Sequence, residues 1–560
     1  MDSRVRVRPS CGNWCGVRWP RDAARTGEVD LVTVGAPPTS SGTSDTHELA
    51  GFGYKQELDR SLGSFSAFAA GFSYISILTG VTALFATGYL NAGPGVWWTW
   101  PVVVGGQILV ALCFMEMAGQ YPIAGSVYQW SKQISSGFTA WMTGWIYIVG
   151  AIVTIAAVAV DWQVVLPQIT TSFQFAGGSA DAGLTFTKGG AQNALLLGTI
   201  LVVITTIINM LGVKLMARIN NVGVAAELIG STVLIILLLF HIHQSPRVIF
   251  HSYDYGAGHP WGYFGALLVG GLLSAYVMYG FDTAGTLAEE TNNPRKNAPP
   301  AIIRAIAAAA IIGGLVILLG ILTNKNIHDK NIGLLGLPYV IKGAFGSTTG
   351  NVFLADTGLA IFVCCLAVQT ATIRMLFSMA RDNQLPFGSA IARVSGHRKV
   401  PVIPALVTGI LAIALLAINV GNQSAFLVIT GIAIIMFYLA YLGVTGPMLV
   451  RRLRGDWPKP DHGPYFSLGR WGLLVNILAV VYGALVAINI AWPRNAVYNA
   501  VGKPHWYFQW SPVLFIGAVV IIGTLYYFLV QARKPAEVLA EHRANIPEAP
   551  IPAPLGDAMP

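Results

Sequence analysis

The chain has 560 residues, of which 54% are hydrophobic and only 11% are charged, whereas soluble domains carry about a quarter of charged residues. So few charges exclude a soluble globular protein of this size, because they could not cover its surface, while a bilayer accepts an apolar outer surface. The net charge of +9 does not indicate nucleic-acid binding, since the basic residues stand in short clusters between apolar runs, which is typical of membrane orientation signals.

The first 60 residues are polar and lack the apolar core of a signal peptide. They are arginine-rich at first and then rich in Pro, Ser, Thr and Gly, so we expect residues 1–60 to form a disordered cytoplasmic tail. Cys11 and Cys15 form a lone pair, which is weak evidence for zinc. We therefore expect no metal or cofactor, and no external disulfides, because no expected outer loop contains a cysteine.

From residue 65 onward, apolar runs of about 20 residues recur, each long enough to cross a bilayer. Backbone groups must be satisfied internally in lipid, and the ten-residue alternation of a barrel is absent, so these runs predict helices. The sequence thus predicts an all-α polytopic membrane protein with twelve transmembrane helices. The expected spans are 65–90, 97–119, 138–168, 190–211, 222–244, 262–288, 300–323, 350–380, 401–419, 423–450, 470–491 and 510–531.

Positive charge decides the orientation of these spans. Twelve spans place both termini on one side, and most of the 34 Lys and Arg lie in the tails and in the loops of that side. The opposite loops hold only Lys188, Arg247, Lys325, Lys330, Lys342, Arg494 and Lys503. The positive-inside rule therefore predicts that both termini are cytoplasmic.

Two of the spans are interrupted in the same way. The first contains the stretch from Ser76 to Thr82, and the sixth contains the stretch from Tyr279 to Thr286, both rich in glycine and hydroxyl side chains. Glycine and hydroxyl residues weaken a helix interior. The two spans lie five helices apart, which points to an inverted repeat with a binding site at mid-membrane. We expect Thr79–Gly80 and Gly280 to be non-helical there.

Five segments also resemble the amino acid–polyamine–organocation permease superfamily, particularly its amino acid/choline branch, which includes 4-aminobutyrate and choline permeases. The segments are Asn91–Gly95, Glu116–Tyr128, Asn220–Gly223 with Glu227, Tyr279–Thr291 and Arg374–Pro386. They follow one another in the order of the family, and the resemblance runs from about residue 60 to 530. Helix 1 departs from the commoner Gly-Ser-Gly-like core of the family, of which only Thr79-Gly80 match.

The resemblance implies a five-plus-five inverted-repeat fold with broken helices 1 and 6 and two peripheral helices. It divides the chain into a transport core at 61–450, peripheral helices 11 and 12 at 451–531, and a cytoplasmic C-terminal tail at 532–560. Thr79 and Gly80 match positions that bind a substrate carboxylate in relatives, Tyr276 matches an aromatic gate, and Gly280 matches the helix 6 break. The candidate substrate-binding residues are Ser76, Thr79, Gly80, Tyr276, Tyr279, Gly280, Phe281 and Asp282.

Charged residues inside spans are costly and need a reason. For Asp282, beside the presumed break, a functional role as ammonium attraction, gating or proton handling is favoured over a structural bond to an amide or hydroxyl. Glu116, Glu289 and Glu290 lie near span ends, where solvated or loop-bracing roles are expected. Asp161 lies 20 residues beyond Trp141, about 30 Å along a helix, so we expect it at the outer interface, lining a vestibule.

Glu227 is the candidate coupling residue. It lies about 7.5 Å into helix 5 from the cytoplasmic side. Proton-coupled relatives carry a lysine in this neighbourhood, beside the position of a sodium ion between helices 1 and 8 in other relatives. Helix 8 offers Thr370, Thr372 and Arg374 as neighbours. Glu227 could exchange a proton, or it could form a permanent ion pair with Arg374 as a structural brace.

The sequence and the resemblance together imply a secondary active transporter, not an enzyme, for amino acids or 4-aminobutyrate-like amines, proton-coupled and working by alternating access. Choline or polyamine uptake and amino acid exchange are alternatives within the class. A non-transporting membrane receptor is the alternative outside it. The expected partners are the small-molecule substrate, a proton or other coupling ion and the lipid bilayer of the plasma membrane, with no nucleic acid.

Overall fold

Long apolar helices make up the structure, a computed structural model that describes residues 48–419, 425–459, 463–499, 505–534 and 537–544. Extended pairing in these ranges is confined to two isolated bridges, Tyr54 with Arg543 and Leu62 with Thr291. The prediction of an all-α polytopic membrane protein is confirmed. Cys11, Cys15 and the outer parts of both tails lie outside the described residues.

The helices match the expected spans. In chain order they are α2 (Ser64–Ile75), α3 (Ile77–Ala92), α4 (Thr99–Gln120), α6 (Gly137–Ile169), α7 (Lys188–Leu211), α8 (Val213–Leu239), α9 (Gly262–Val277), α10 (Thr283–Thr286), α11 (Pro294–Leu322), α12 (Lys330–Arg381), α14 (Val402–Asn419), α15 (Ala425–Arg454), α16 (Gly472–Ala491) and α19 (Ser511–Leu529). Within the described ranges, nine helical stretches are long and apolar enough to cross a membrane. One of them, Ser64–Gln120, holds two expected spans, and two shorter apolar helices, Gly262–Val277 and Val402–Ile418, complete the set.

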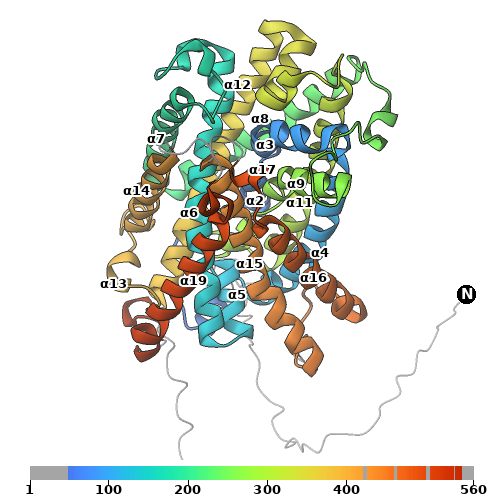
Figure 1. Ribbon diagram of the computed structural model, residues 1–560. Helices are drawn as coiled ribbons and strands as arrows, with labels where there is room; N and C mark the ends of the chain where they lie inside the picture. Colours follow the sequence, from blue (N-terminus) through green and yellow to red (C-terminus); the bar gives the residue numbers. More distant parts are fainter. Residues whose placement is uncertain (1–47, 420–424, 460–462, 500–504, 535–536, 545–560) are drawn as a thin grey trace, which may run out of the picture. The chain divides into compact units, whose positions relative to one another are not determined.

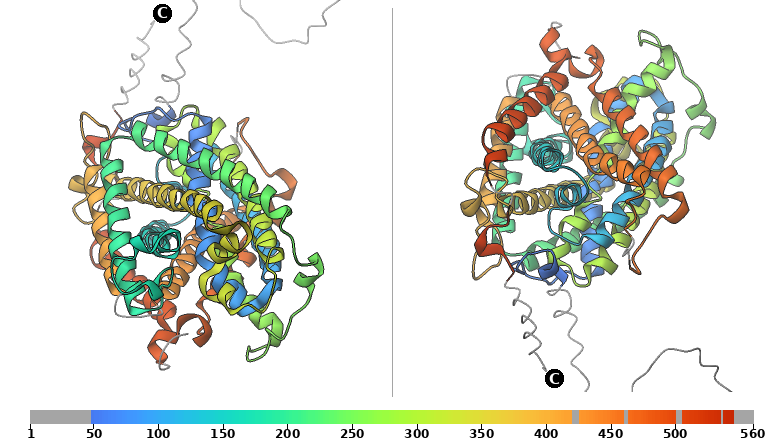
Figure 2. Two further views of the ribbon diagram at one scale, coloured as in Figure 1. Left: turned by 90° about the horizontal axis from the view of Figure 1, so that it is seen from above. Right: turned by 90° about the horizontal axis from the view of Figure 1, so that it is seen from below.

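The helix α6 lies at the centre of the bundle, and α19 lies at its edge. The most apolar part of α6 is 89% buried inside the protein, whereas that of α19 is 11% buried. Seen from either end, α6 is viewed down its axis with other helices around it (Figure 2). A helix apolar all round and buried on every face is a scaffold, because its surface is taken up by packing against neighbours rather than lipid.

The two ends of the bundle differ. We call the end that carries residues 48–62 and 537–544 the tail end, and the opposite end, with residues 170–187 and 240–261, the loop end (Figure 1). Short helix α5 (Ser126–Ile134) lies at the tail end. The long helix α12 begins with a bent segment at the loop end, where Gly336 and Gly346 have non-helical backbone angles.

The part of the N-terminal tail nearest the membrane is packed, not disordered. Tyr54 is 2% exposed, and its hydroxyl donates a hydrogen bond of 2.9 Å to Asp382 at the end of α12. The Lys55 amide donates to the carbonyl of His542, and the Ala544 amide donates to Gly53. The expected tail boundary at residue 60 is therefore wrong for residues 48–60, which, with residues 537–544, cover the tail end.

Candidate functional site

Helix 1 breaks at Ser76, between α2 and α3. Ser76 has φ 33° and ψ 99°, a left-handed conformation that costs a non-glycine residue about 1–3 kcal/mol. Thr79 and Gly80 lie in the first turn of α3, so the expectation that they are non-helical is wrong by three residues. The break exposes the first amides of α3, which carry the partial positive charge of a helix start.

A carboxylate from a distant helix holds this break in place. Glu227 on α8 is 1% exposed, and its Oε1 accepts hydrogen bonds from the Ser76 hydroxyl at 3.0 Å and the Leu78 amide at 3.1 Å. The Ser76 hydroxyl also lies 2.6 Å from that of Thr79. An acid at a helix start is stabilised by the helix dipole. Glu227 thereby links α8 to the start of α3.

The ion pair between Glu227 and Arg374 that we considered is not formed. Arg374 instead makes a two-pronged pair with Glu290, with nitrogen–oxygen distances of 2.8 and 3.2 Å. The helices α8 and α12 are in contact, with Gly223 against Val363 and Gly230 against Asp356. Glu227 therefore lies about level with residue 360.

Thr372, the other expected neighbour of Glu227, is also remote from it. It lies 12 residues after residue 360, the position on α12 that is level with Glu227, and therefore about 18 Å further along the helix. Its hydroxyl donates to the Val368 carbonyl at 2.7 Å. The structure therefore does not bring Thr372 to the proposed coupling site.

Helix 6 breaks between Val277, the last residue of α9, and Thr283, the first of α10. Gly280 lies in this break with φ +93°, and its amide donates to the Tyr441 hydroxyl at 2.8 Å. A Cβ atom added to Gly280 would lie 1.8 Å from Cδ1 of Tyr74. Only glycine fits this position, both for its backbone angle and for the close approach of α2.

Asp282 fastens the break to the surrounding helices. Its carboxylate accepts hydrogen bonds from Tyr441 at 2.6 Å, from Tyr147 at 3.0 Å and from Ser126 at 3.0 Å, which belong to α15, α6 and α5. The side chain is fully buried. In this conformation three hydroxyl groups of the protein donate hydrogen bonds to the Asp282 carboxylate. These contacts are those of the structural role, a bond to a hydroxyl, that the sequence left as the alternative.

Aromatic rings fill the space around the two breaks. Tyr279 stacks on Phe437 with a centroid distance of 4.6 Å, and Tyr276 and Tyr74 meet the edge of the Tyr279 ring at 6.1 and 6.2 Å. Phe281 instead packs against Phe114 and Tyr441. The expected gate residue Tyr276 is thus next to the helix 6 break, and Phe281 has the contacts of an ordinary core residue.

Tyr74, Tyr147, Phe437 and Tyr441 could not be predicted as members of this site, since isolated tyrosines and phenylalanines in apolar spans are common.

Asp161 is buried, contrary to the interfacial position expected for it. The residue is 1% exposed, and neither carboxylate oxygen has a hydrogen-bond partner. It lies close enough to Tyr276 and to Cys364 to interact with both electrostatically. It therefore belongs to the interior, beside the expected gate, and not to an open vestibule.

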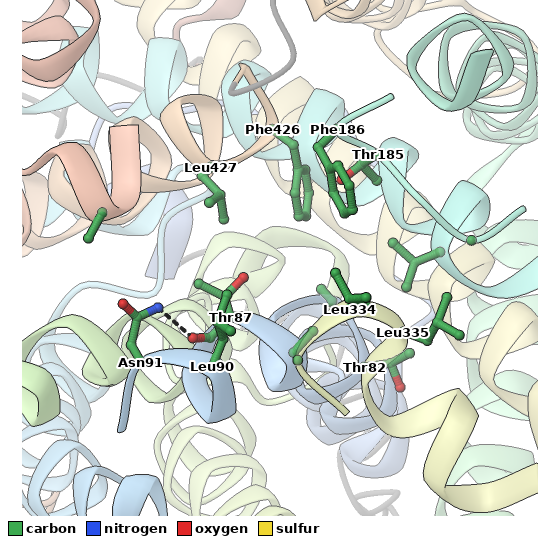
Figure 3. A pocket seen from close by; sticks show the side chains of 16 residues that line it. Thr82, Thr87, Leu90, Asn91, Thr185, Phe186, Leu334, Leu335, Phe426 and Leu427 are labelled. Carbon is green, nitrogen blue, oxygen red and sulfur yellow. Dashed lines mark hydrogen bonds between the residues drawn. The ribbon is translucent and has the colours of Figure 1, made fainter. Parts of the chain in front are cut away.

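A cavity of about 260 Å³ opens near the loop end between α3, α6, α15 and the bent start of α12. Figure 3 shows its walls, with Phe186 and Phe426 side by side and Thr82 and Thr87 on α3. No charged residue is among the sixteen that line it, and Val164 of α6 is one of them. Since Val164 lies one helical turn from Asp161, the cavity ends a short distance from that carboxylate.

Buried ion pairs close the tail end. Arg381 binds both oxygens of Glu289, at 2.9 and 2.6 Å, and all four charged groups of the Arg374–Glu290 and Arg381–Glu289 pairs are at most 1% exposed. Lys132 adds a pair with Asp382 at 2.7 Å. The solvated alternative for Glu289 and Glu290 is wrong, and both brace the chain after α10 against α12.

Glu116 has the expected loop-bracing role. It pairs with Arg452, and it accepts hydrogen bonds from the Trp457 indole at 3.2 Å and from the Leu468 amide at 2.9 Å. It therefore ties the end of α4 to the connection between α15 and α16.

Replacing Arg381 with methionine should destabilise the protein by about 3–5 kcal/mol, because Glu289 would be left as an unpaired buried charge. The double replacement Arg381→Met with Glu289→Gln should recover much of this loss. The midpoint of thermal unfolding of the purified protein measures both effects. Lys214→Met, which removes an exposed pair with Asp59, is the control and should cost less than about 1 kcal/mol. Equal losses in the single and double variants would show that the pair itself is not the cause.

Two broken helices facing each other inside a bundle of membrane-length helices are the arrangement of a membrane transporter. The sequence profile of the family described as "Amino acid permease" matches residues 62–521. The chain belongs to this amino acid permease family, whose members are transporters and not enzymes, and it is an amino acid transporter of the multi-pass membrane class.

Three relatives illustrate the similarity. The chain is 29% identical to the amino-acid permease BAT1 of Arabidopsis thaliana, over 89% of this chain and 96% of the relative. It is 25% identical to the branched-chain amino acid permease BcaP of Bacillus subtilis, over 78% and 90% of the two chains. It is 27% identical to the methylthioribose transporter of Bacillus subtilis, over 65% and 76%.

Proposed function

We propose that this protein is a secondary active transporter that carries amino acids or 4-aminobutyrate-like amines by alternating access, driven by protons. It acts in the plasma membrane with both tails in the cytoplasm, so that the tail end faces inward and the loop end outward. The excess of Lys and Arg in the tails and in the loops of the tail end supports this orientation.

The observation that carries the proposal is the pair of helix breaks inside the bundle, with buried ion pairs on the side of the tail end. Buried ion pairs of α12 with Glu289 and Glu290 close the tail end, while a cavity lies at the loop end above the breaks. We infer that this conformation is one of the two states that alternating access requires, the one in which the ion pairs at the tail end are closed. The second state would open the ion pairs and close the cavity.

The breaks supply the substrate site. Glu227 occupies the Ser76 hydroxyl and the Leu78 amide, and the Thr79 hydroxyl beside them, at the same helix start, would receive the substrate carboxylate, since helix starts generally bind anions. Tyr276 and Tyr279 would close over the bound substrate, and Gly280 with Asp282 would let α9 and α10 tilt against the scaffold. Glu227 would couple a proton to this movement, because its carboxylate holds the start of α3.

Uptake into proteoliposomes tests the proposal. Competition among neutral and basic amino acids, 4-aminobutyrate, choline and putrescine, under a proton or a sodium gradient, should show uptake of amino acids or amines that a proton gradient drives. Uptake restricted to choline or putrescine, or exchange that no gradient drives, would contradict the proposed substrate or coupling. Binding without translocation would support a receptor.

A further inference from the structure

A carboxylate without a partner lies inside the scaffold at Asp161. Both of its oxygens are buried and free of hydrogen bonds, and the residue is 1% exposed. None of the ion pairs formed by the described residues includes it. A buried carboxylate with no partner is costly, so such a group either takes up a proton or receives a cation from outside the protein.

A second unpartnered group accompanies it. The Tyr276 hydroxyl on α9 is buried without a hydrogen bond, and Tyr276 lies within electrostatic range of Asp161. The groups within electrostatic range of Asp161 are uncharged: Tyr276 on α9, Tyr279 in the helix 6 break, and Cys364 and Cys365 on α12. One carboxyl group, one hydroxyl and two tyrosine rings form a setting that suits an organic cation, which would be bound by the ionised carboxylate.

The position of Asp161 fits the far end of a bound substrate. Thr154 of α6 lies level with the helix 6 break, because its hydroxyl is 3.3 Å from that of Tyr279. Asp161 stands seven residues further along α6, about 10.5 Å towards the loop end, and one turn short of the cavity wall at Val164. Helical side chains lean towards the helix start, so the carboxylate leans back towards the break.

We propose that Asp161 and Tyr276 bind a cationic nitrogen at the end of the substrate farthest from its carboxylate, which selects amino acids with a distal ammonium or guanidinium group. This inference rests on the proposed function and extends it. An alkylammonium offers three donors and a guanidinium five, enough to engage both Asp161 and the Tyr276 hydroxyl. A bare sodium ion would require more oxygen ligands than these two side chains provide.

Matched ligand pairs test this with the purified full-length protein, through the shift of its thermal unfolding midpoint on ligand binding. Arginine should stabilise the wild type at concentrations at least tenfold lower than its neutral isostere citrulline, and lysine should do so at least tenfold below norleucine. Asp161→Asn should raise the half-maximal concentration of arginine and lysine at least tenfold and change that of the neutral ligands less than twofold. Tyr276→Phe should raise the values for the cationic ligands about tenfold or more, from the loss of one hydrogen bond to a charged group.

Asp356→Asn is the control, because it makes the same chemical change in α12, where the carboxylate faces Gly230. It should behave as the wild type does. The proposal is overturned if the wild type does not prefer the cationic ligand, if Asp161→Asn keeps the preference, or if it weakens both ligands of a pair equally. Stabilisation by sodium chloride alone that Asp161→Asn removes would assign the site to a coupling ion instead, and would overturn it too. Should Asp161→Asn not fold, Tyr276→Phe decides on the same criterion.

Failure of this inference is distinguishable from failure of the proposed function. Stabilisation and uptake of neutral amino acids alone would overturn the distal-cation site and leave an amino acid transporter. If no amino acid or amine stabilises the protein or is taken up, both the distal-cation site and the proposed function are wrong.

Discussion

Gly280→Leu is expected to abolish substrate uptake while the protein still inserts into the membrane. The glycine has φ +93°, and a side chain there would begin 1.8 Å from the Tyr74 ring, so the two breaks could not approach each other as they do now. The apolar spans are unchanged, and hydropathy governs insertion. Uptake into proteoliposomes and the monodispersity of the purified variant measure the two effects.

The matched control for this change is Gly517→Leu. Gly517 lies in α19, where an added Cβ would meet no atom within 4 Å, so uptake should be retained. Normal uptake by Gly280→Leu would contradict the placement of the helix 6 break in the substrate site.

Glu227→Gln is expected to separate substrate exchange from substrate accumulation. Glutamine keeps an oxygen that can accept from Ser76 and Leu78, so the helix 1 break should survive, but it cannot take up or release a proton. The variant should exchange labelled for unlabelled substrate at a rate near that of the wild type. Under an imposed proton gradient it should fail to concentrate substrate, a loss of at least tenfold in accumulation.

Glu227→Asp keeps a titratable group and should retain part of the accumulation. If Glu227→Gln concentrates substrate as well as the wild type, the proton role is wrong. If it does not fold, the bond of Glu227 to the start of α3 is a structural brace.

The membrane-spanning segments could be predicted from the sequence because hydropathy is a property of whole segments, but the location of a break could not. Glycine and hydroxyl residues marked both interrupted spans, yet the helix 1 break falls at Ser76 and not at Thr79–Gly80. The reason is tertiary: Glu227, 151 residues from Ser76 in sequence, accepts from the Ser76 side chain and caps α3. Local propensity does not contain that contact.

The burial of Asp161 could not be predicted from the sequence for a similar reason. Counting from Trp141 assumed that this aromatic residue marks the membrane boundary, but Trp141 is 1% exposed and stacks on Tyr526 of α19 at 5.8 Å. The helix α6 is also 33 residues long, longer than a perpendicular span requires. Residue counting therefore could not tell a buried position from an interfacial one.

The choice of partner for Arg374 shows a further limit. Arg374 lies on α12, the eighth expected span, and Glu227 lies on α8, the fifth. These two helices pack in a register that places Glu227 at the level of residue 360 of α12. The register between helices depends on packing at Gly223 and Gly230, which a single sequence does not reveal. Glu290, at the end of the sixth span, is the residue that the fold brings to Arg374.

Alternating access itself is tested most directly by the distance between spin labels at Ser64 and Ser136, which are exposed at the tail-end starts of α2 and α6. The native cysteines are first replaced, and uptake by the labelled protein is verified. Pulsed electron paramagnetic resonance in lipid nanodiscs should show one short distance without substrate, when the ion pairs of Glu289 and Glu290 are closed. Adding a transported amino acid should populate a second, longer distance as α2 tilts away from the scaffold. A single unchanged distance in a protein that still transports would contradict the account.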